Sequence, residues 1–238
     1  MEAHKRKVIY MFDFTQRTEM IYGKEAMEKL SRAKVAILGV GGVGSYTFEA
    51  LIRSGIGHIT IVDKDTVERS NINRQLVALN STIGTKKVDV AKERAKDINP
   101  LAVVEALDIF YLKESDLDLS EFDYVVDAID NITGKIAIVE SCLQTDVPLI
   151  SAMGCGNRKE PSMLKISDIF DTNVCPICKI MRKQLKDRGI PKLKVIYSTE
   201  SYVKQEDRTP GSTPFVPATA GLLMAGEVVN YLTYSEST

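Results

Sequence analysis

The sequence predicts a doubly wound α/β fold of the Rossmann type, in which helices cover both faces of a mainly parallel sheet. Short apolar runs of buried-strand type alternate along the chain with helical segments, beginning with VAIL at 35–38. Such strand–helix–strand alternation builds parallel sheets that are covered on both sides. The second observation is a glycine-rich turn, GVGGVG, placed directly between the first apolar run and the next helix. That placement is typical of a nucleotide-binding sheet.

The expected elements follow in chain order. A helical segment at 14–33 precedes the first strand, and later strands are expected at 58–65, 103–110, 122–130 and 147–154. Helices are expected between them at 45–55, 84–98 and 133–145. After residue 154 the pattern changes to a strand/helix extension. It has strands at 164–169 and 195–200 around a basic helix at 176–188, a proline-rich loop at 206–217 and a closing helix at 216–232.

Composition places limits on the class of protein. The 238 residues suffice for one sizeable domain, and no linker-like stretch divides them. Four irregularly spaced cysteines indicate a reducing, cytoplasmic setting and no disulfide framework. We read no secretory signal and no membrane span, and so expect no membrane partner. The net charge of −1 neither favours nor excludes nucleic acid.

The turn contains the pattern G-x-G-x-x-G at Gly39, Gly41 and Gly44. Glycines there let the chain turn tightly and let a phosphate approach the N-terminus of the following helix. The second strand ends in two acids, Asp63 and Asp65, and Asp63 could accept hydrogen bonds from a ribose. The pattern alone predicts a dinucleotide site and leaves NAD and ATP as alternatives.

Three further features favour ATP with Mg²⁺. Gly42 adds a glycine that opens the loop further, and SNINRQ places Asn71, Arg74 and Gln75 just beyond the second strand. GTKK adds Lys86 and Lys87 at the start of the next helix. Cleavage between the α- and β-phosphates requires positive groups around the leaving pyrophosphate. Asp130, after the fourth strand, is the acid expected near Mg²⁺.

The segments VAILGVGGVGS, DKDTVERSNINRQ, IGTKKVDVA and DAIDN, in this order, resemble the adenylating domain of ubiquitin-activating-type enzymes. That group includes the adenylyltransferases of the thiamine and molybdopterin pathways. The resemblance implies an ATP site that adenylates a carboxylate. It implies that the glycines and Asn71, Arg74 and Lys87 contact the phosphates, and that Asp130 holds Mg²⁺. It also implies a homodimer in which Arg17 reaches the ATP of the neighbouring subunit.

The second half of the chain bears on which carboxylate is activated. Members that activate sulfur-carrier proteins carry two C-x-x-C pairs that bind a structural zinc, whereas this chain has only CPIC at 175–178. Cys142 and Cys155 lie too far apart to replace the second pair, so we expect no structural zinc. The segments PLISAMGCGN, CPICKIMRKQLKDRGI and IYSTE instead resemble the tRNA threonylcarbamoyladenosine dehydratases.

This resemblance implies a single domain over 1–238, with an ATP-binding part at 14–155 and a tRNA-facing part at 156–238. It also implies a reaction on tRNA adenosine 37, where the threonylcarbamoyl carboxylate attacks the α-phosphate of ATP. The carbamoyl group then attacks the acyl-adenylate within the same molecule, which closes a ring and expels AMP. Attack within one molecule has a high effective concentration, so no protein nucleophile is strictly required.

A tRNA substrate would also explain the basic helix. Seven basic residues and one acid lie between Lys179 and Lys194, and such a surface supplies salt-dependent affinity for phosphates. The expected tRNA-facing residues are Lys179, Arg182, Lys183, Lys186 and Glu200. For Glu200, substrate positioning, base catalysis and a structural bridge all remain open.

Two other functions remain as alternatives. One is an adenylyltransferase that acts on the C-terminus of a ubiquitin-like sulfur carrier, and the other is a nucleotide-binding regulator without turnover. The cations of SNINRQ and GTKK argue against the regulator, which needs no groups around a leaving pyrophosphate. A sulfur-handling accessory protein is left open.

Overall fold

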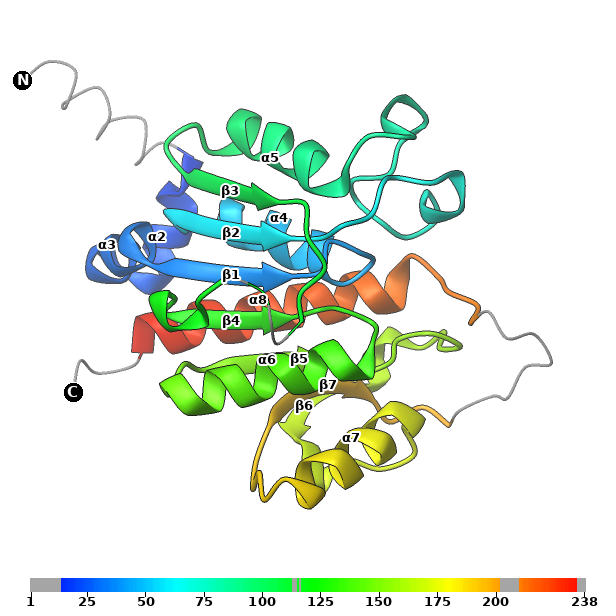
Figure 1. Cartoon of the computed structure of the whole chain (residues 1–238). Helices are drawn as coiled ribbons and strands as arrows, with labels where there is room; N and C mark the ends of the chain where they lie inside the picture. The colour runs from blue at the N-terminus through cyan, green and yellow to red at the C-terminus, as the bar shows by residue number, and fades with distance from the viewer. Residues whose placement is uncertain (1–13, 113–114, 116, 202–209, 235–238) are drawn as a thin grey trace, which may run out of the picture.

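A seven-stranded sheet in the order β3-β2-β1-β4-β5-β7-β6 forms the centre of the computed structural model (Figure 1). The model describes residues 14–112, 115, 117–201 and 210–234. All neighbouring strands are parallel except β6, which runs antiparallel to β7 at one edge. The strands are β1 (Lys34–Leu38), β2 (His58–Val62), β3 (Val103–Leu107), β4 (Tyr124–Asp127), β5 (Leu149–Ala152), β6 (Leu164–Asp168) and β7 (Lys194–Ser198).

Helices cover both faces of this sheet, as the sequence predicts. They are α2 (Gln16–Tyr22), α3 (Lys24–Arg32), α4 (Gly44–Arg53), α5 (Lys87–Ile98), α6 (Ile132–Thr145), α7 (Pro176–Asp187) and α8 (Phe215–Tyr234). Short 3₁₀ turns lie at Arg69–Asn71, Asn80–Thr82, Leu119–Glu121, Pro161–Met163 and Ile169–Asp171. The predicted doubly wound fold with its C-terminal extension is therefore confirmed.

Strand β1 shows how the two faces are divided. Val35 and Ile37 belong to the core that packs against α3, α4, α5 and α8, whereas Ala36 and Leu38 belong to the core beneath α6. Successive side chains of a strand point to opposite faces, so a strand buried on both sides must be apolar throughout. A third core, between α6, α7 and β7, fills the extension.

Several predicted boundaries were wrong, each for a local reason. The helix expected at 14–33 is two helices, because Gly23 has a φ of 83° that no right-handed helix accommodates. The strands expected to reach Phe110 and Asp130 end at Leu107 and Asp127, and the residues after them leave the sheet. Helix α8 begins at Phe215, inside the expected loop 206–217, of which 206–209 lie outside the described residues.

Among the described helices, α8 is long and apolar enough to cross a membrane by length and composition, which the sequence reading did not anticipate. A core helix of a soluble protein meets the same criteria. Val216, Ala220 and Met224 are fully buried in the main core. At Gly221 an added Cβ would lie 2.4 Å from the carbonyl oxygen of Val43, so α8 packs directly on the start of α4.

An ion-pair network joins α4 to α5. The Glu49 carboxylate accepts hydrogen bonds from Arg94 at 2.6 and 3.0 Å and from Arg53 at 2.8 Å. Burial alone would raise the pKa of Glu49, but the hydrogen bonds and charges of Arg94 and Arg53 outweigh it and hold this pKa below its usual value of 4.5. The network therefore stabilises the packing of α4 and α5 while Glu49 is ionised.

Candidate active site

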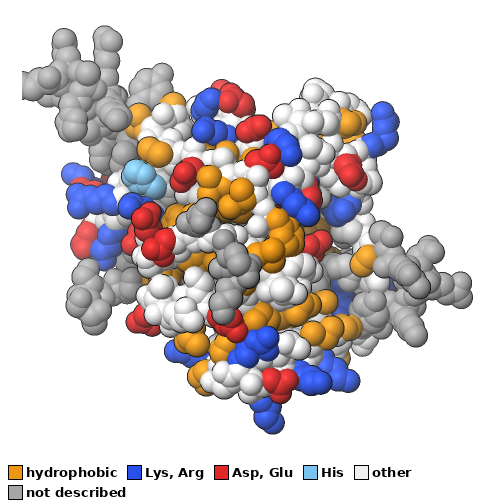
Figure 2. Space-filling model, viewed as in Figure 1, with side chains coloured by type: hydrophobic (Ala, Val, Ile, Leu, Met, Phe, Trp, Pro, Cys, Tyr) orange, Lys and Arg blue, Asp and Glu red, His pale blue; other side chains and the backbone are white. Residues whose placement is uncertain are grey.

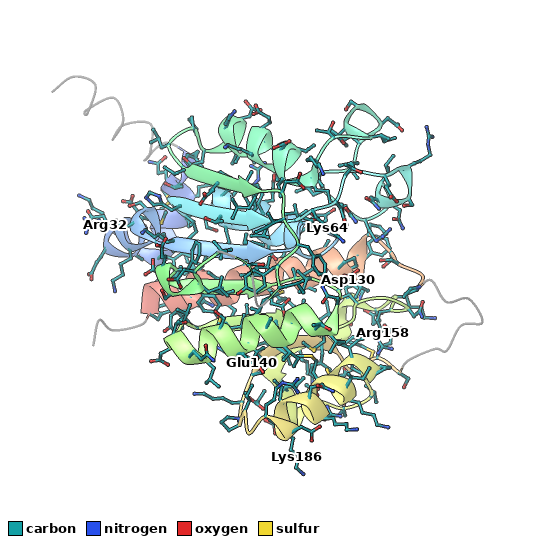
Figure 3. The ribbon with its side chains drawn as sticks, viewed as in Figure 1. Arg32, Lys64, Asp130, Glu140, Arg158 and Lys186 are labelled. Atoms are coloured by element: carbon teal, nitrogen blue, oxygen red, sulfur yellow. The ribbon has the colours of Figure 1, made fainter. Side chains whose placement is uncertain are left out.

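A cavity of about 800 Å³ lies at the carboxyl edge of the sheet, beside the ends of β1 and β4. The chain proceeds from β1 outward to β2 and β3 and then returns to β4 on the other side, so this edge is a topological switch point. Ligands of open α/β sheets bind at such a point. The cavity is lined by residues 39, 41–43, 62–65, 109–111, 128–131, 152–158, 175–177 and 210–212, among others. Figure 3 labels Lys64, Asp130 and Arg158 around this edge of the molecule.

The glycine loop forms one wall of the cavity, and two of its glycines are required by geometry. Gly39 has a φ of 95°, and a Cβ there would lie 2.7 Å from the carbonyl oxygen of Ala128. A Cβ on Gly44 would lie 1.8 Å from the carbonyl oxygen of Gly39. A Cβ added to Gly41 would have the side-chain nitrogen of Gln75 as its nearest neighbour, at 4.0 Å, so the space above the loop is open. Gly42 faces Pro217 of α8.

The two acids after β2 hold the loop and the first lysine of α5. Asp63 accepts hydrogen bonds from the backbone N–H groups of Val40 at 2.7 Å and Asp65 at 2.8 Å. A carboxylate has about four acceptor positions, so Asp63 keeps capacity toward the cavity. Asp65 pairs with Lys87 at 2.8 Å. The Lys87 side chain is only 6% exposed, so Lys87 is not a solvated surface lysine.

The residues of SNINRQ come together at the same cavity. Arg74 donates to the carbonyl oxygen of Ser70 at 2.8 Å, which directs its guanidinium along the cavity wall. Asn71 and Gln75 are buried, and the Gln75 Oε1 atom has no hydrogen-bond partner among the described residues. Together with Lys87, the structure thus places the predicted phosphate-side residues in one wall.

The fourth strand supplies one predicted residue and one group that the sequence reading missed. Asp130 is exposed and lines the cavity, as expected of a residue that meets a ligand. Asp127, three residues earlier, is fully buried and accepts from Lys135 at 3.0 Å and from Ser151 at 2.5 Å. Lys135 lines the cavity floor. The sequence feature that could have indicated this buried ion pair is the single lysine, Lys135, among the apolar residues of helix α6.

A second missed residue is Arg158, in the loop after β5. It is 3% exposed and lines the cavity, on the side nearest α7 (Figure 3). A buried arginine in a cavity wall is suited to hold a carboxylate or phosphate oxygen, because its fork of N–H donors matches those groups. The cavity therefore has cationic groups along two walls, one from SNINRQ and α5 and one from this loop.

The predicted tRNA-facing residues lie outside the cavity and differ in their surroundings. Lys179, Lys183 and Lys186 are exposed on α7, where basic side chains gather at the lower end of the view in Figure 2. Arg182 is half-buried, and its guanidinium is held by the Thr172 hydroxyl and carbonyl. The Arg182 contact thus fixes α7 to the preceding turn, a use that the charge pattern did not reveal.

Two other predicted residues are also placed away from the cavity wall. Glu200 accepts from the backbone N–H groups of Lys159 and Glu160, both at 3.1 Å, so the structure favours the bridging role that the sequence left open. Arg17 is exposed on α2, at the opposite end of the sheet from the cavity (Figure 1). Within one chain Arg17 does not reach the site, and its expected role requires a second copy.

The chain matches the model of the ThiF family over residues 15–238. It is 45% identical to a tRNA threonylcarbamoyladenosine dehydratase of Bacillus subtilis over 90% of this chain and 92% of the relative. The crystal structure of E. coli tRNA N6-threonylcarbamoyladenosine dehydratase in complex with ATP superposes with a TM-score of 0.87 at 31% identity, covering 93% and 94% of the two chains.

Similarity to the sulfur-carrier branch extends over less of the chain. A sulfur carrier protein adenylyltransferase of Thermus thermophilus is 35% identical but covers 54% of this chain and 48% of its own length. The similarity to the dehydratases, by contrast, includes the extension with α7 and β7. The chain belongs to the ThiF family and, within it, to the tRNA threonylcarbamoyladenosine dehydratases.

Proposed function

We propose that this protein uses ATP to dehydrate the threonylcarbamoyl group of tRNA adenosine 37, through an acyl-adenylate, to a cyclic product. The observation that carries the proposal is one cavity with cationic residues along two of its walls. One wall, with the glycine loop, Arg74 and Lys87, suits a triphosphate. The other, with Arg158, lies beside the basic helix and suits the carboxylate of a substrate that arrives from that side.

The nucleotide would lie across the glycine loop. Asp63 has acceptor positions left for ribose hydroxyls. Gln75 Oε1, which has no hydrogen-bond partner within the described part of the chain, would accept from a hydroxyl or amino group of the nucleotide. An unpaired buried acceptor costs about 1–3 kcal/mol, so a donor from the ligand would stabilise the complex. The backbone N–H groups at the start of α4 would face the phosphates.

The cations have distinct tasks in the proposed reaction. Lys87 and Arg74 would hold the β- and γ-phosphates and stabilise the charge that develops on the departing pyrophosphate. Asp65 holds Lys87 in place, so the ammonium is positioned before ATP binds. Arg158 would hold the substrate carboxylate against the α-phosphate, which supplies the orientation that the first step needs.

Mg²⁺ fits the residues present. Mg²⁺ commonly binds through one or two carboxylates together with substrate phosphates and retains several waters. Asp130 is an exposed carboxylate in the wall of the cavity that the phosphate-side cations also line. When bound there, Mg²⁺ would neutralise charge on the phosphate oxygens.

The tRNA would contact α7. Lys179, Lys183 and Lys186 are exposed on one helix whose first turn lines the cavity, so phosphates bound along α7 would lead the modified nucleoside toward Arg158. Two other cations of the basic stretch, Arg188 and Lys194, pair with Glu140 and Glu227 and are less available to bind tRNA phosphates.

We propose a cytoplasmic homodimer in which Arg17 completes the neighbour's site, and leave a sulfur-handling partner as a further possibility.

The test is to incubate the protein with ATP and threonylcarbamoyl-modified tRNA, digest the RNA and analyse the nucleosides by mass spectrometry. The proposal predicts a nucleoside lighter by one water, with AMP and pyrophosphate released together. Lys87→Ala should abolish this product, whereas Lys96→Ala, on the exposed side of the same helix, should not. Pyrophosphate release that requires a sulfur-carrier protein, together with one tightly bound zinc per chain, would support the alternative instead.

A further inference from the structure

The CPIC segment brackets the first turn of α7 with two thiols that the proposed reaction does not use. Cys175 is the residue directly before the helix, Pro176 is its first residue, and Cys178 follows one turn on. Both cysteines are free and buried. The Cys175 side chain makes no capping hydrogen bond to the first turn of α7.

These surroundings distinguish Cys175 from the other cysteines. The neighbouring Cys178 thiol first of all, and then the backbone N–H groups of the first turn and the charge of Arg158, hold the pKa of Cys175 below its usual range, against the opposing effect of burial. Burial raises the pKa of Cys142 and of Cys155 to about 12. The thiolate is the nucleophilic form of cysteine, so the lowered pKa favours Cys175 over Cys142 and Cys155 as the nucleophile.

The same turn forms part of the cavity wall. Cys175, Pro176 and Ile177 all line the cavity, so this turn belongs to the wall that a small solute in the cavity would meet. Ile177 packs tightly on the loop after β5, because a Cβ on Gly154 would lie 2.9 Å from its Cγ1 atom. A change in the first turn of α7 would therefore press on the loop that carries Arg158.

Among the described residues, no group of three or more His, Cys, Asp or Glu side chains could hold a metal ion, so the pair lacks the further ligands of a zinc site. Two thiols three residues apart at the start of a helix are instead suited to thiol–disulfide chemistry. Side chains at i and i+3 have Cβ atoms about 5–6 Å apart, whereas a disulfide needs about 3.8 Å. The turn would have to tighten by about 1–2 Å to close the bond.

We propose that Cys175 and Cys178 form an oxidant-sensitive dithiol site in the cavity wall, which closes to an intramolecular disulfide when a small peroxide enters. In the first step the Cys175 thiolate attacks one oxygen of hydrogen peroxide. The O–O bond breaks, Cys175 becomes a sulfenic acid and hydroxide leaves. In the second step the Cys178 sulfur attacks the Cys175 sulfur, and the thiol proton and the sulfenic hydroxyl leave as water. Two thiols and one peroxide thus give one disulfide and two waters.

The site is tested on the full chain by treating the reduced protein with hydrogen peroxide and alkylating it after unfolding. Peptides are then mapped without reductant. The proposal predicts a Cys175–Cys178 peptide that is two hydrogens lighter and unalkylated, with Cys142 and Cys155 still alkylated. Recovery of Cys175 and Cys178 as free thiols, or equally fast oxidation of Cys142 or Cys155, would overturn it.

Single substitutions distinguish the roles of the two thiols. In Cys178→Ser the sulfenic acid at Cys175 cannot be resolved, so dimedone should label Cys175. In Cys175→Ser dimedone should label neither position, and Cys142→Ser should oxidise as the parent does. Equal labelling of the two single variants would contradict the assigned order.

Coupling to the cavity has its own measurement. Oxidation of the parent protein should weaken its ATP binding, and reductant should restore it. The control is the Cys178→Ser variant, whose ATP affinity after peroxide treatment is compared with the affinity of the same variant in its reduced form. Unchanged ATP affinity in protein whose disulfide is verified would refute the coupling. The mass readout does not depend on turnover, so failure of the proposed function would remain distinguishable from failure of this proposal.

Discussion

Replacing Lys135 by methionine tests whether the buried ion pair beneath the cavity holds the site together. Asp127 is fully buried, and Lys135 is 2% exposed. Both contacts from the Lys135 ammonium to the Asp127 carboxylate measure 3.0 Å. Among the described residues, the further donors to Asp127 are the Ser151 hydroxyl and the N–H of Ile129. Removing one partner of a buried pair costs about 3–5 kcal/mol, because the remaining charge is uncompensated.

For a domain of this size a loss of 1 kcal/mol lowers the melting temperature by about 2–4 °C. Lys135→Met should therefore lower it by about 6–20 °C in thermal unfolding followed by circular dichroism. The double variant Asp127→Asn/Lys135→Met should recover much of the loss, since replacing both members of such a pair by neutral residues is often tolerated.

The matched control is Lys96→Met on α5. Lys96 forms an ion pair with Glu93 at 2.5 Å, but both side chains are more than half exposed. Exposed pairs contribute about 0–1 kcal/mol, so this variant should melt near the parent temperature. A Lys135→Met variant that melts like Lys96→Met, or a double variant less stable than Lys135→Met, would refute the reasoning.

Three other expectations follow from the account. If Arg17 acts on the neighbouring subunit, the Arg17→Ala and Lys87→Ala proteins should each be inactive alone but regain turnover when mixed. The reason is that a mixed dimer holds one intact site. No recovery after verified subunit exchange would exclude that role. Glu49→Gln should be less stable than the parent at neutral pH, since the lowered pKa of Glu49 stabilises the fold above about 4.5 and is lost as the pH falls through its folded-state value. The difference in melting temperature should thus shrink below pH 4.5, and a constant difference would count against the network. Charge reversal of Lys183 and Lys186 together should weaken tRNA retention on a filter and reduce its salt dependence, with ATP binding unchanged; normal retention would make α7 a solvated surface.

The local parts of the site could be predicted from the sequence. The glycine loop, Asp63, Arg74 and Lys87 all follow strand ends or begin helices, and parallel strands bring their carboxyl ends to one edge. Those residues do line one cavity. The short apolar strands could also be predicted from the sequence, because a strand that is buried on both faces must be a continuous apolar run.

What could not be predicted depends on contacts between residues far apart in the chain. The pairing of Asp127 with Lys135 and Ser151 joins a strand, a helix and a second strand, and helical periodicity alone does not reveal it. Likewise the charge pattern could not show that Arg182 is held by Thr172, or that the Glu200 carboxylate is used by backbone N–H groups. Each such side chain is polar, so its partner in the fold decides whether it faces a ligand.

The central claim, that a carboxylate on tRNA is adenylated, is tested most directly by an isotope transfer. Threonylcarbamoyl-modified tRNA with both carboxylate oxygens labelled with heavy oxygen is converted in ordinary water, and the released AMP is analysed by mass spectrometry. Attack of the carboxylate on the α-phosphate, followed by ring closure, predicts one heavy oxygen in each AMP. AMP without the label alongside cyclised tRNA, or the label in inorganic phosphate with ADP as the nucleotide product, would contradict the account.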